Sequence, residues 1–306
     1  MIDILTGFAV IALAVFVGWI AGRTGVLGPN ARPVLARLNF SVLSPFLLFS
    51  VLSTADVRAL FSALLPVSAI AAVSVMLVFG AISMLVLRRG VARTTIGALA
   101  SGYVNGNNIG IPIALYLLGN AAYSAPIVLL QLLLFAPIAL AVLGATVQGR
   151  TSVGSIVRTT FTNPIIIGSL LGVAVSVSGL ELPPIIQDPI HLIGQAAVPL
   201  MLIAYGLSLH GTRLLEPGTG LHDVVLAATL KLAVMPAIAW ALGAFAFGLE
   251  GRELYAVTVL AALPTAQNVF NFAQRYETAE VVARDTVFVT TVGSVPVLLL
   301  VSALLG

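Results

Sequence analysis

The chain has no cysteine among its 306 residues and very little charge of either sign. The absence of cysteine excludes disulfides, thiol catalysis and thiolate-bound metals. Charged residues make up 8% of the chain, against about 25% in soluble domains, and hydrophobic residues make up 59%. The mean hydropathy is +1.12. This composition indicates an integral membrane protein built of α-helices.

Signatures of several functional classes are missing as well. The sequence has no His-Glu-x-x-His, no Gly-x-Ser-x-Gly, no phosphate-binding loop and no acidic cluster for a metal. We therefore expect no enzymatic activity, no cofactor and no metal site. A net charge of +3 is too small to indicate a nucleic-acid partner. The first apolar run follows Asp3 instead of a basic segment, which predicts a permanent span and not a removable signal peptide.

Ten apolar stretches have roughly the 20 residues that a helix needs to cross a bilayer. They cover residues 2–21, 34–54, 62–87, 94–118, 123–147, 161–179, 190–210, 223–247, 253–273 and 281–304. The longest connection, the linker 148–160, separates a first half, 1–147, from a second half, 161–306. Each half holds five spans. Because five is an odd number, the second half must enter the membrane upside down, which predicts two inverted five-helix repeats.

Internal similarity and the placement of arginine agree with this organisation. Leu-Ser-Pro-Phe-Leu-Leu at 43–48 resembles Ala-Val-Pro-Leu-Met-Leu at 197–202, and Pro137 in span five matches Pro296 in span ten. Loops after even-numbered spans contain two arginines, Arg58 and Arg252. Loops after odd-numbered spans contain Arg23, Arg32, Arg37, Arg88, Arg89, Arg93, Arg150, Arg158, Arg213, Arg275 and Arg284. The positive-inside rule then places the odd loops in the cytoplasm and both termini outside.

Polar and helix-breaking residues interrupt spans four and nine. The first interruption reads Gly-Tyr-Val-Asn-Gly-Asn-Asn-Ile-Gly-Ile-Pro at 102–112, and the second reads Leu-Pro-Thr-Ala-Gln-Asn-Val-Phe-Asn at 263–271. Bare amides and broken backbone are costly in hydrocarbon unless protein or a water-filled cavity satisfies them. A pair of such breaks, one per half, indicates the substrate site of a secondary transporter. The N-termini of the half-helices suit an anion, and their C-termini suit a cation or a hydrogen-bond donor.

The residues in these interruptions are candidates for binding the substrate. They are Asn105, Asn107, Asn108 and Pro112 in span four, and Pro264, Gln267, Asn268 and Asn271 in span nine. The amides offer neutral donors and acceptors, and the prolines remove backbone donors. We expect Gly106 and Gly110 to adopt unusual dihedrals. Two structural alternatives stay open: the amides bridge helices, or the glycines, with Gly102, let helices pack closely.

Two further candidates lie inside other spans. Lys231, well inside span eight, could pair with an anionic substrate or fill a cation site, or it could extend its side chain towards the cytoplasm. Gln131, at depth in span five, is a candidate for lining the cavity. No aspartate or glutamate lies at mid-depth, and His191, His210 and His222 fall near span ends. A carboxylate-based proton or sodium relay is therefore not indicated.

Several short motifs resemble the auxin efflux carrier family. They are Asn-Ile-Gly-Ile-Pro at 108–112, Asn-Pro-Ile-Ile-Ile-Gly at 163–168, Val-Pro-Leu at 198–200, Gly-Leu-Ser-Leu at 206–209 and Leu-Pro-Thr-Ala at 263–266 with Asn268. The resemblance covers nearly the whole chain. It implies a scaffold of spans 1, 2, 6 and 7, and a mobile transport domain of spans 3–5 and 8–10. Spans 4 and 9 would cross at their broken midpoints, with the substrate site beside the crossing.

The resemblance includes plant auxin exporters and bacterial malonate and malate permeases, but the chain lacks the long cytoplasmic loop of the large plant proteins. Auxin as substrate and control by phosphorylation are therefore not transferred. We expect a carrier for a small organic anion, a mono- or dicarboxylate, in the plasma or inner membrane. The alternatives are a sodium-coupled symporter of another solute and a ligand-binding sensor that does not transport. Proton or sodium coupling stays open, and Gly-Trp-Ile-Ala-Gly at 18–22 permits a homodimer.

Overall fold

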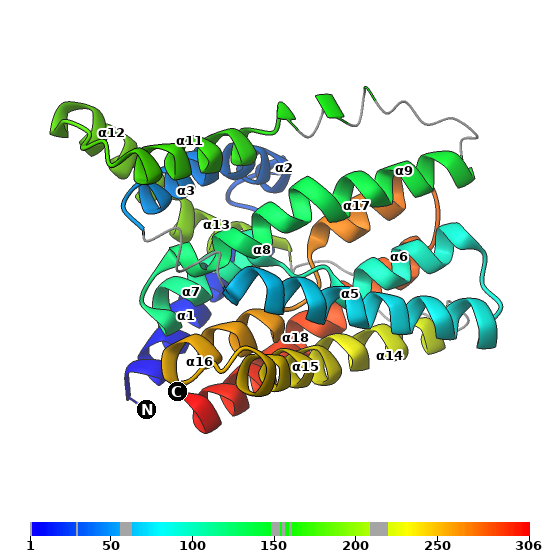
Figure 1. The fold of residues 1–306 in the computed structure, drawn as a ribbon. Coiled ribbons are helices and arrows are strands. Elements are labelled where there is room, and N and C mark those ends of the chain that lie inside the picture. The colour runs from blue at the N-terminus through cyan, green and yellow to red at the C-terminus, as the bar shows by residue number, and fades with distance from the viewer. Residues whose placement is uncertain are drawn as a thin grey trace. The chain divides into compact units, whose positions relative to one another are not determined.

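The computed structural model describes residues 2–28, 30–55, 63–147, 154, 157–158, 161–208 and 220–306. These residues form helices and no extended strands; a single isolated bridge joins Val104 and Thr265 (Figure 1). The prediction of an all-α protein is confirmed. Most of the predicted linker 148–160, and His210 and Arg213, lie outside the described residues.

The chain divides into two compact units, and each is made of segments from both halves of the sequence. The first unit comprises Met1–Ser62, Asn107–Leu129 and Phe161–Thr212, and the second comprises Ala63–Gly106, Leu130–Thr160 and Arg213–Gly306. The first unit contains α1 (Ile2–Thr24), α2 (Ala31–Leu38), η1 (Asn39–Leu43), α3 (Ser44–Ser53), α7 (Ile111–Leu118), η5 (Ala121–Ser124), α11 (Pro164–Ser178), α12 (Pro184–Gln195) and α13 (Ala197–Ser208). The π-helical turn η4 (Gly106–Gly110) begins at Gly106, the last residue of the second unit's segment Ala63–Gly106, and continues in the first unit. Helix α8 (Ala125–Leu130) begins in the first unit and ends at Leu130 in the second.

The second unit holds the remaining helices. They are α5 (Leu65–Ala81), η3 (Ile82–Val86), α6 (Val91–Gly102), η6 (Gln131–Phe135), α9 (Ala136–Val147), α14 (Leu221–Thr229), η7 (Leu230–Val234), α15 (Met235–Ala241), η8 (Leu242–Ala246), α16 (Gly251–Ala261), α17 (Gln267–Arg275) and α18 (Glu280–Leu305). Residues 107–129, from the predicted spans four and five, belong to the first unit together with segments of the predicted spans 1, 2, 6 and 7.

The helices have the length and composition of a polytopic membrane protein. Six continuous helical segments of the described chain are long and apolar enough to cross a bilayer. They are Pro33–Ser53, Leu65–Val86, Ala121–Val147, Pro184–Leu207, Leu221–Ala246 and Glu280–Leu305. Three shorter apolar helices are Ala12–Thr24, Gly106–Leu118 and Pro164–Ser178. Span seven was predicted from residue 190, but its helix starts at Pro184, a position where proline suits the first turn.

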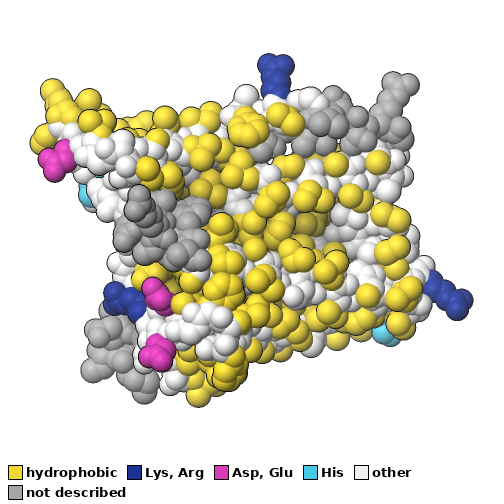
Figure 2. All heavy atoms as spheres, in the orientation of Figure 1, with side chains coloured by type: hydrophobic (Ala, Val, Ile, Leu, Met, Phe, Trp, Pro, Cys, Tyr) yellow, Lys and Arg dark blue, Asp and Glu magenta, His cyan; other side chains and the backbone are white. Residues whose placement is uncertain are grey.

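Large apolar side chains cover much of the surface. In Figure 2 they dominate the visible face, and the few charged side chains lie towards its edges. Ile185, Phe245 and Leu85 are 83%, 79% and 78% exposed. Apolar surface on this scale is unusual for a soluble protein and fits contact with lipid.

Close contacts at glycine hold two helix pairs of the first unit together. A Cβ at Gly18 of α1 would clash with the carbonyl oxygen of Ile203 in α13. A Cβ at Gly172 of α11 would lie 2.7 Å from the carbonyl oxygen of Phe49 in α3. Only glycine permits such an approach of two backbones. The contact of Gly18 lies within the chain, so this glycine already packs a helix of its own protomer.

In the second unit, two long helices end in the same way. The N–H of Leu87 donates to Ile82 O at 3.0 Å, and the N–H of Phe247 donates to Leu242 O at 3.0 Å. The next residue in each case has a positive φ, which is 52° at Arg88 and 61° at Gly248. After each turn the chain reverses into α6 or α16, which packs against the preceding helix. These two helical hairpins lead into the second break and into the start of the first break.

Candidate functional site: the paired helix breaks

Both predicted interruptions are real ends of helices. Helix α6 ends at Gly102, and the chain is extended at Tyr103, with φ −86° and ψ 102°, before η4 begins. Helix α16 ends at Ala261, and α17 begins at Gln267. The predicted span 253–273 is therefore two helices. Each break exposes the C-terminal carbonyls of one half-helix and the N-terminal N–H groups of the next.

The two break segments satisfy each other's backbone. They pair as an antiparallel bridge between Val104 and Thr265, 161 positions apart in the sequence. Unpaired backbone groups at this depth would each cost several kcal/mol in hydrocarbon. The two bonds run from Asn105 N to Pro264 O, 2.8 Å, and from Ala266 N to Tyr103 O, 2.9 Å. The bridge thus makes two interrupted helices compatible with burial.

Side chains complete the pairing. The hydroxyl of Thr265 donates to the carbonyl oxygen of Ala100 in the last turns of α6, at 2.5 Å. The N–H of Thr265 donates to the hydroxyl of Thr290 in α18, at 3.1 Å. Thr290 in turn donates to Thr286 O at 2.7 Å. All these threonines are fully buried. A chain of hydrogen bonds therefore ties the second break to α6 and to α18.

The amides of the first break belong to two different units. Asn105, 5% exposed, lies in the second unit and uses its backbone N–H in the bridge. Asn107 and Asn108 lie in the first unit and are half-buried. The Nδ2 of Asn107 lies 3.1 Å from Asn108 Oδ1 and 3.4 Å from the hydroxyl of the buried Ser44. Within the described chain the buried Oδ1 of Asn107 has no hydrogen-bond partner.

The amides of the second break lie on α17, which belongs to the second unit. Gln267 and Asn268 are half-buried and Asn271 is exposed. The side chain of Asn268 forms a hydrogen bond with the phenol of Tyr103. The Tyr103 ring is itself buried beside Phe272, with the ring centres 6.4 Å apart, and beside Phe135 at 6.5 Å. Asn268 thus occupies the polar edge of an aromatic cluster.

Pro264 and Pro112 have different roles in the breaks. Pro264 is buried and supplies a carbonyl to the bridge. Pro112 is the second residue of α7 and lies inside the continuous helix Gly106–Leu118, which begins with the π-helical turn η4.

The expected glycine dihedrals are wrong. Gly110 has helical values, φ −63° and ψ −42°, and Gly106 is not among the glycines with positive φ. Extended backbone at Tyr103 makes the break instead. Gly102 serves close packing, since a Cβ there would lie 2.7 Å from Ala72 O.

Gln131 and Lys231 are both buried in the second unit. Gln131 is 3% exposed at the start of η6, and within the described chain its Oε1 has no hydrogen-bond partner. Lys231 in η7 is 0% exposed. Its Nζ donates to Ala261 O at 2.7 Å and to Met235 Sδ at 3.1 Å. The alternative that the lysine extends towards the cytoplasm is therefore wrong, because its ammonium lies at the end of α16.

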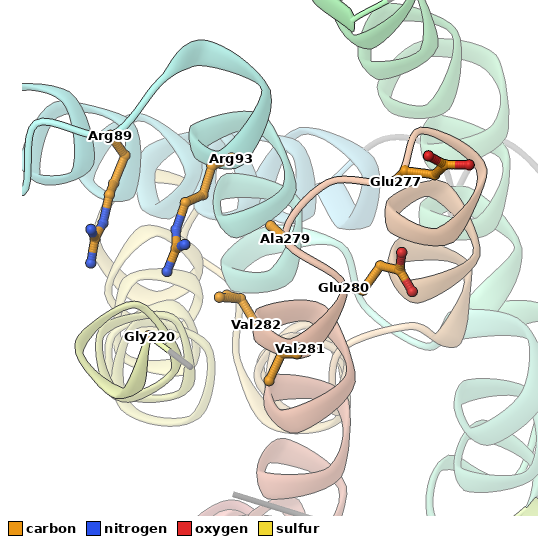
Figure 3. A pocket seen from close by; sticks show the side chains of 8 residues that line it. All are labelled: Arg89, Arg93, Gly220, Glu277, Ala279, Glu280, Val281 and Val282. Atoms are coloured by element: carbon orange, nitrogen blue, oxygen red, sulfur yellow. The ribbon is translucent and has the colours of Figure 1, made fainter. Parts of the chain in front are cut away.

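A separate cavity lies in the same unit. It has a volume of about 390 Å³ and is lined by Arg89, Arg93, Gly220, Glu277, Ala279, Glu280, Val281 and Val282. Figure 3 shows the two arginines directed towards Gly220, while Glu277 and Glu280 point away from them. Both arginines form ion pairs with the buried Asp223, at 3.1 Å and 2.7 Å, as a desolvated carboxylate requires. No residue of the break segments lines this cavity.

Sequence reasoning missed the partners that complete the breaks. Tyr103 lay inside the predicted interruption but was not singled out, although an aromatic hydroxyl among amides was a usable signal. Thr290 carried no signal, because its role depends on a residue 25 positions earlier in the chain. Thr265 is likewise explained only by its contact with Ala100, 165 positions away.

Comparison with known proteins gives a consistent picture. The family model described as "Membrane transport protein" matches residues 3–151 and 144–302. A Rhizobium meliloti (strain 1021) protein named "Putative malonate transporter" is 28% identical over 290 residues, which cover 92% of this chain and 89% of that protein. The rice protein named "Probable auxin efflux carrier component 5b" is 33% identical over 149 residues, which cover 47% of this chain and 40% of its own length. Another rice protein, "Probable auxin efflux carrier component 1b", is 29% identical over 167 residues, which cover 53% of this chain and 30% of that protein.

The hydrogen bond from Thr265 to Thr290 can be tested by stability. Replacing Thr290 with valine keeps the shape but leaves the buried N–H of Thr265 without an acceptor, which should cost about 1–3 kcal/mol. Thr290→Ser retains the hydroxyl and is the matched control. Thermal unfolding of the two purified variants in the same detergent should show a lower midpoint for Thr290→Val than for Thr290→Ser. Equal midpoints would show that this bond does not support the break.

Proposed function

Because the chain belongs to the membrane transport protein family, which includes auxin efflux carriers, we propose that it carries a small organic anion by alternating access around the two paired breaks. It is a membrane transporter and not an enzyme. The bridge between Val104 and Thr265 is the observation that carries the proposal. A continuous helix satisfies its own backbone hydrogen bonds in a membrane and would pack at least as well. Two paired interruptions therefore indicate a function other than packing.

A carboxylate suits the groups that the breaks present. N-terminal N–H groups of η4 and α17 favour negative charge, and the amides of Asn107, Asn108, Gln267 and Asn268 add neutral donors. We assign Asn105, Pro112, Gln131, Pro264 and Asn271 to the surroundings of this substrate site. The name of the Rhizobium protein favours malonate, or another short dicarboxylate, as the first acid to test.

We further propose ten spans arranged as two inverted repeats. In the first unit, Gly18 contacts Ile203, and Gly172 contacts Phe49. The two glycines lie 154 positions apart in the sequence, and so do their two partners. In the second unit, the equivalent turns at Leu87 and Phe247 lie 160 positions apart. Each half would then supply one partner to every such contact, as a pseudo-two-fold relation between inverted halves requires. In this arrangement both termini are extracytoplasmic.

We assign the scaffold and the moving part of the proposed carrier to the two compact units. The first unit, with α1, α3, α11 and α13, would be the scaffold, and the second unit, with most of the break contacts, would be the transport domain. The boundary between units falls inside the first break, between Gly106 and Asn107.

The proposal predicts saturable uptake of one acid by proteoliposomes that contain the purified protein. Labelled malonate, malate, lactate and indole-3-acetate are offered in turn, with and without imposed proton and sodium gradients. We expect malonate or another of these acids to enter faster than into protein-free vesicles and to compete with its unlabelled form. If correctly folded protein carries none of them, the proposal of an organic-anion carrier is wrong.

Single amide substitutions test the position of the site. Asn108→Ala and Asn268→Ala each remove a donor to a charged group, worth about 1.5–3 kcal/mol, and should slow uptake roughly tenfold or more. Asn30→Ala is the matched control, because Asn30 is an exposed loop residue outside the breaks. Uptake rates are compared at equal amounts of monodisperse protein. Rates equal to that of Asn30→Ala in both variants would remove the breaks from substrate binding.

A further inference from the structure

The carbonyl oxygen of Ala261 is an acceptor that the second break leaves without its helical partner. In a continuous helix it would accept from the N–H of Thr265, four residues later. That N–H donates instead to Thr290, at 3.1 Å. The Nζ of Lys231 takes its place on Ala261 O at 2.7 Å. The lysine thus caps the C-terminal end of the half-helix α16.

The cap contacts backbone and a thioether, and no carboxylate of the described residues forms an ion pair with it. The ion pairs between described residues involve Arg89, Arg93 and Arg284, and none includes Lys231. Its second contact is the neutral thioether of Met235, at 3.1 Å. The C-terminal end of a helix carries a partial negative charge that stabilises a cation in its last turn. Lys231, 0% exposed, is therefore held where the dipole of α16 is most negative.

The first break has no such charge. In the last turns of α6, Ala100 O accepts from the neutral hydroxyl of Thr265. The spacing of 160 residues between the turns at Leu87 and Phe247 places Ala71 at the position equivalent to Lys231. Ala71 is also 0% exposed and brings no polar atom. One break therefore carries a built-in cation and the other does not.

We propose that the Lys231 ammonium occupies the place of a coupling cation, so that this carrier works without sodium. Unwound carbonyls and C-terminal ends of half-helices are the groups that coordinate Na⁺ in secondary transporters. Here that position already holds a covalently tethered positive charge. A sodium ion bound a few ångströms from Nζ would be strongly repelled in this buried setting. This inference rests on the proposed carrier function and specifies its coupling.

The experiment compares wild type with three variants at residue 231 and one at the surface. Lys231→Arg keeps the charge, Lys231→Met keeps the volume without the charge, and Lys231→Ala leaves room for an ion. Arg252→Gln, which removes an exposed positive charge, is the control for net charge. Thermal midpoints in detergent are measured in NaCl and in choline chloride of equal ionic strength, together with ²²Na⁺ binding. Neither measurement requires a known substrate.

Wild type and Arg252→Gln should show the same midpoint in both salts and no ²²Na⁺ binding. Lys231→Ala should become more stable in NaCl than in choline chloride and should bind ²²Na⁺. Where an acid is transported, wild-type uptake should be equal in the two salts. Lys231→Met should be at least about tenfold slower, a loss of about 1.4 kcal/mol in activation free energy. Lys231→Arg should stay closer to wild type than Lys231→Met.

The inference is wrong if uptake by wild type, or its thermal stability, depends on sodium. It is also wrong if Lys231→Met takes up the acid at the same rate as wild type. A folded Lys231→Ala that gains no response to sodium would overturn it too. If Lys231→Ala does not fold, Lys231→Met and the wild-type sodium measurements decide the question. If wild type transports none of the tested acids, the proposed substrate class fails, while the binding and stability measurements still test the lysine.

Discussion

The structure depends on the backbone hydrogen bonds that join the two broken helical segments. A membrane offers no water to unpaired N–H and C=O groups, so a helix broken at depth must find other partners. Here the two broken segments find each other, through bonds of 2.8 Å and 2.9 Å on either side of the Val104–Thr265 bridge. Each break therefore supplies backbone hydrogen-bond partners to the other. The hairpin turns, the aromatic cluster around Tyr103 and the contact with α18 all position these few residues.

The bridge also fixes where charge can be placed. Each break joins the C-terminal end of one half-helix, with its carbonyls, to the N-terminal end of the next, with its N–H groups. The carbonyl ends have internal caps, a threonine hydroxyl for α6 and the Lys231 ammonium for α16. The N-terminal ends carry amide side chains and no acidic residue. This distribution is the basis for proposing an anion as the substrate, and it places the Lys231 side chain at the end of α16 in the second unit.

The sequence was sufficient for the class of fold and for the location of the breaks. Long apolar runs predicted membrane helices, and the Asn-Asn and Gln-Asn pairs marked the interruptions, because both signals are local in the chain. The details that failed depend on distant contacts. The first break is centred on Tyr103 and not on the glycines, since its extended backbone is stabilised by residues some 160 positions away. Lys231 could not be oriented from sequence either, because its acceptor, Ala261, lies 30 residues further on.

The complete absence of cysteine offers the most direct test that the breaks line a substrate pocket. A single cysteine is introduced at Asn268, which is half-buried, or at the neighbouring Val269, which is fully buried and serves as control. Thiolates react only where water and reagent reach them. The rate of modification by a small membrane-impermeant thiol reagent is then measured with and without saturating transported acid. We predict that Asn268→Cys reacts and is protected by the acid, while Val269→Cys does not react. An unreactive Asn268→Cys, or one whose rate the acid leaves unchanged, would contradict the account.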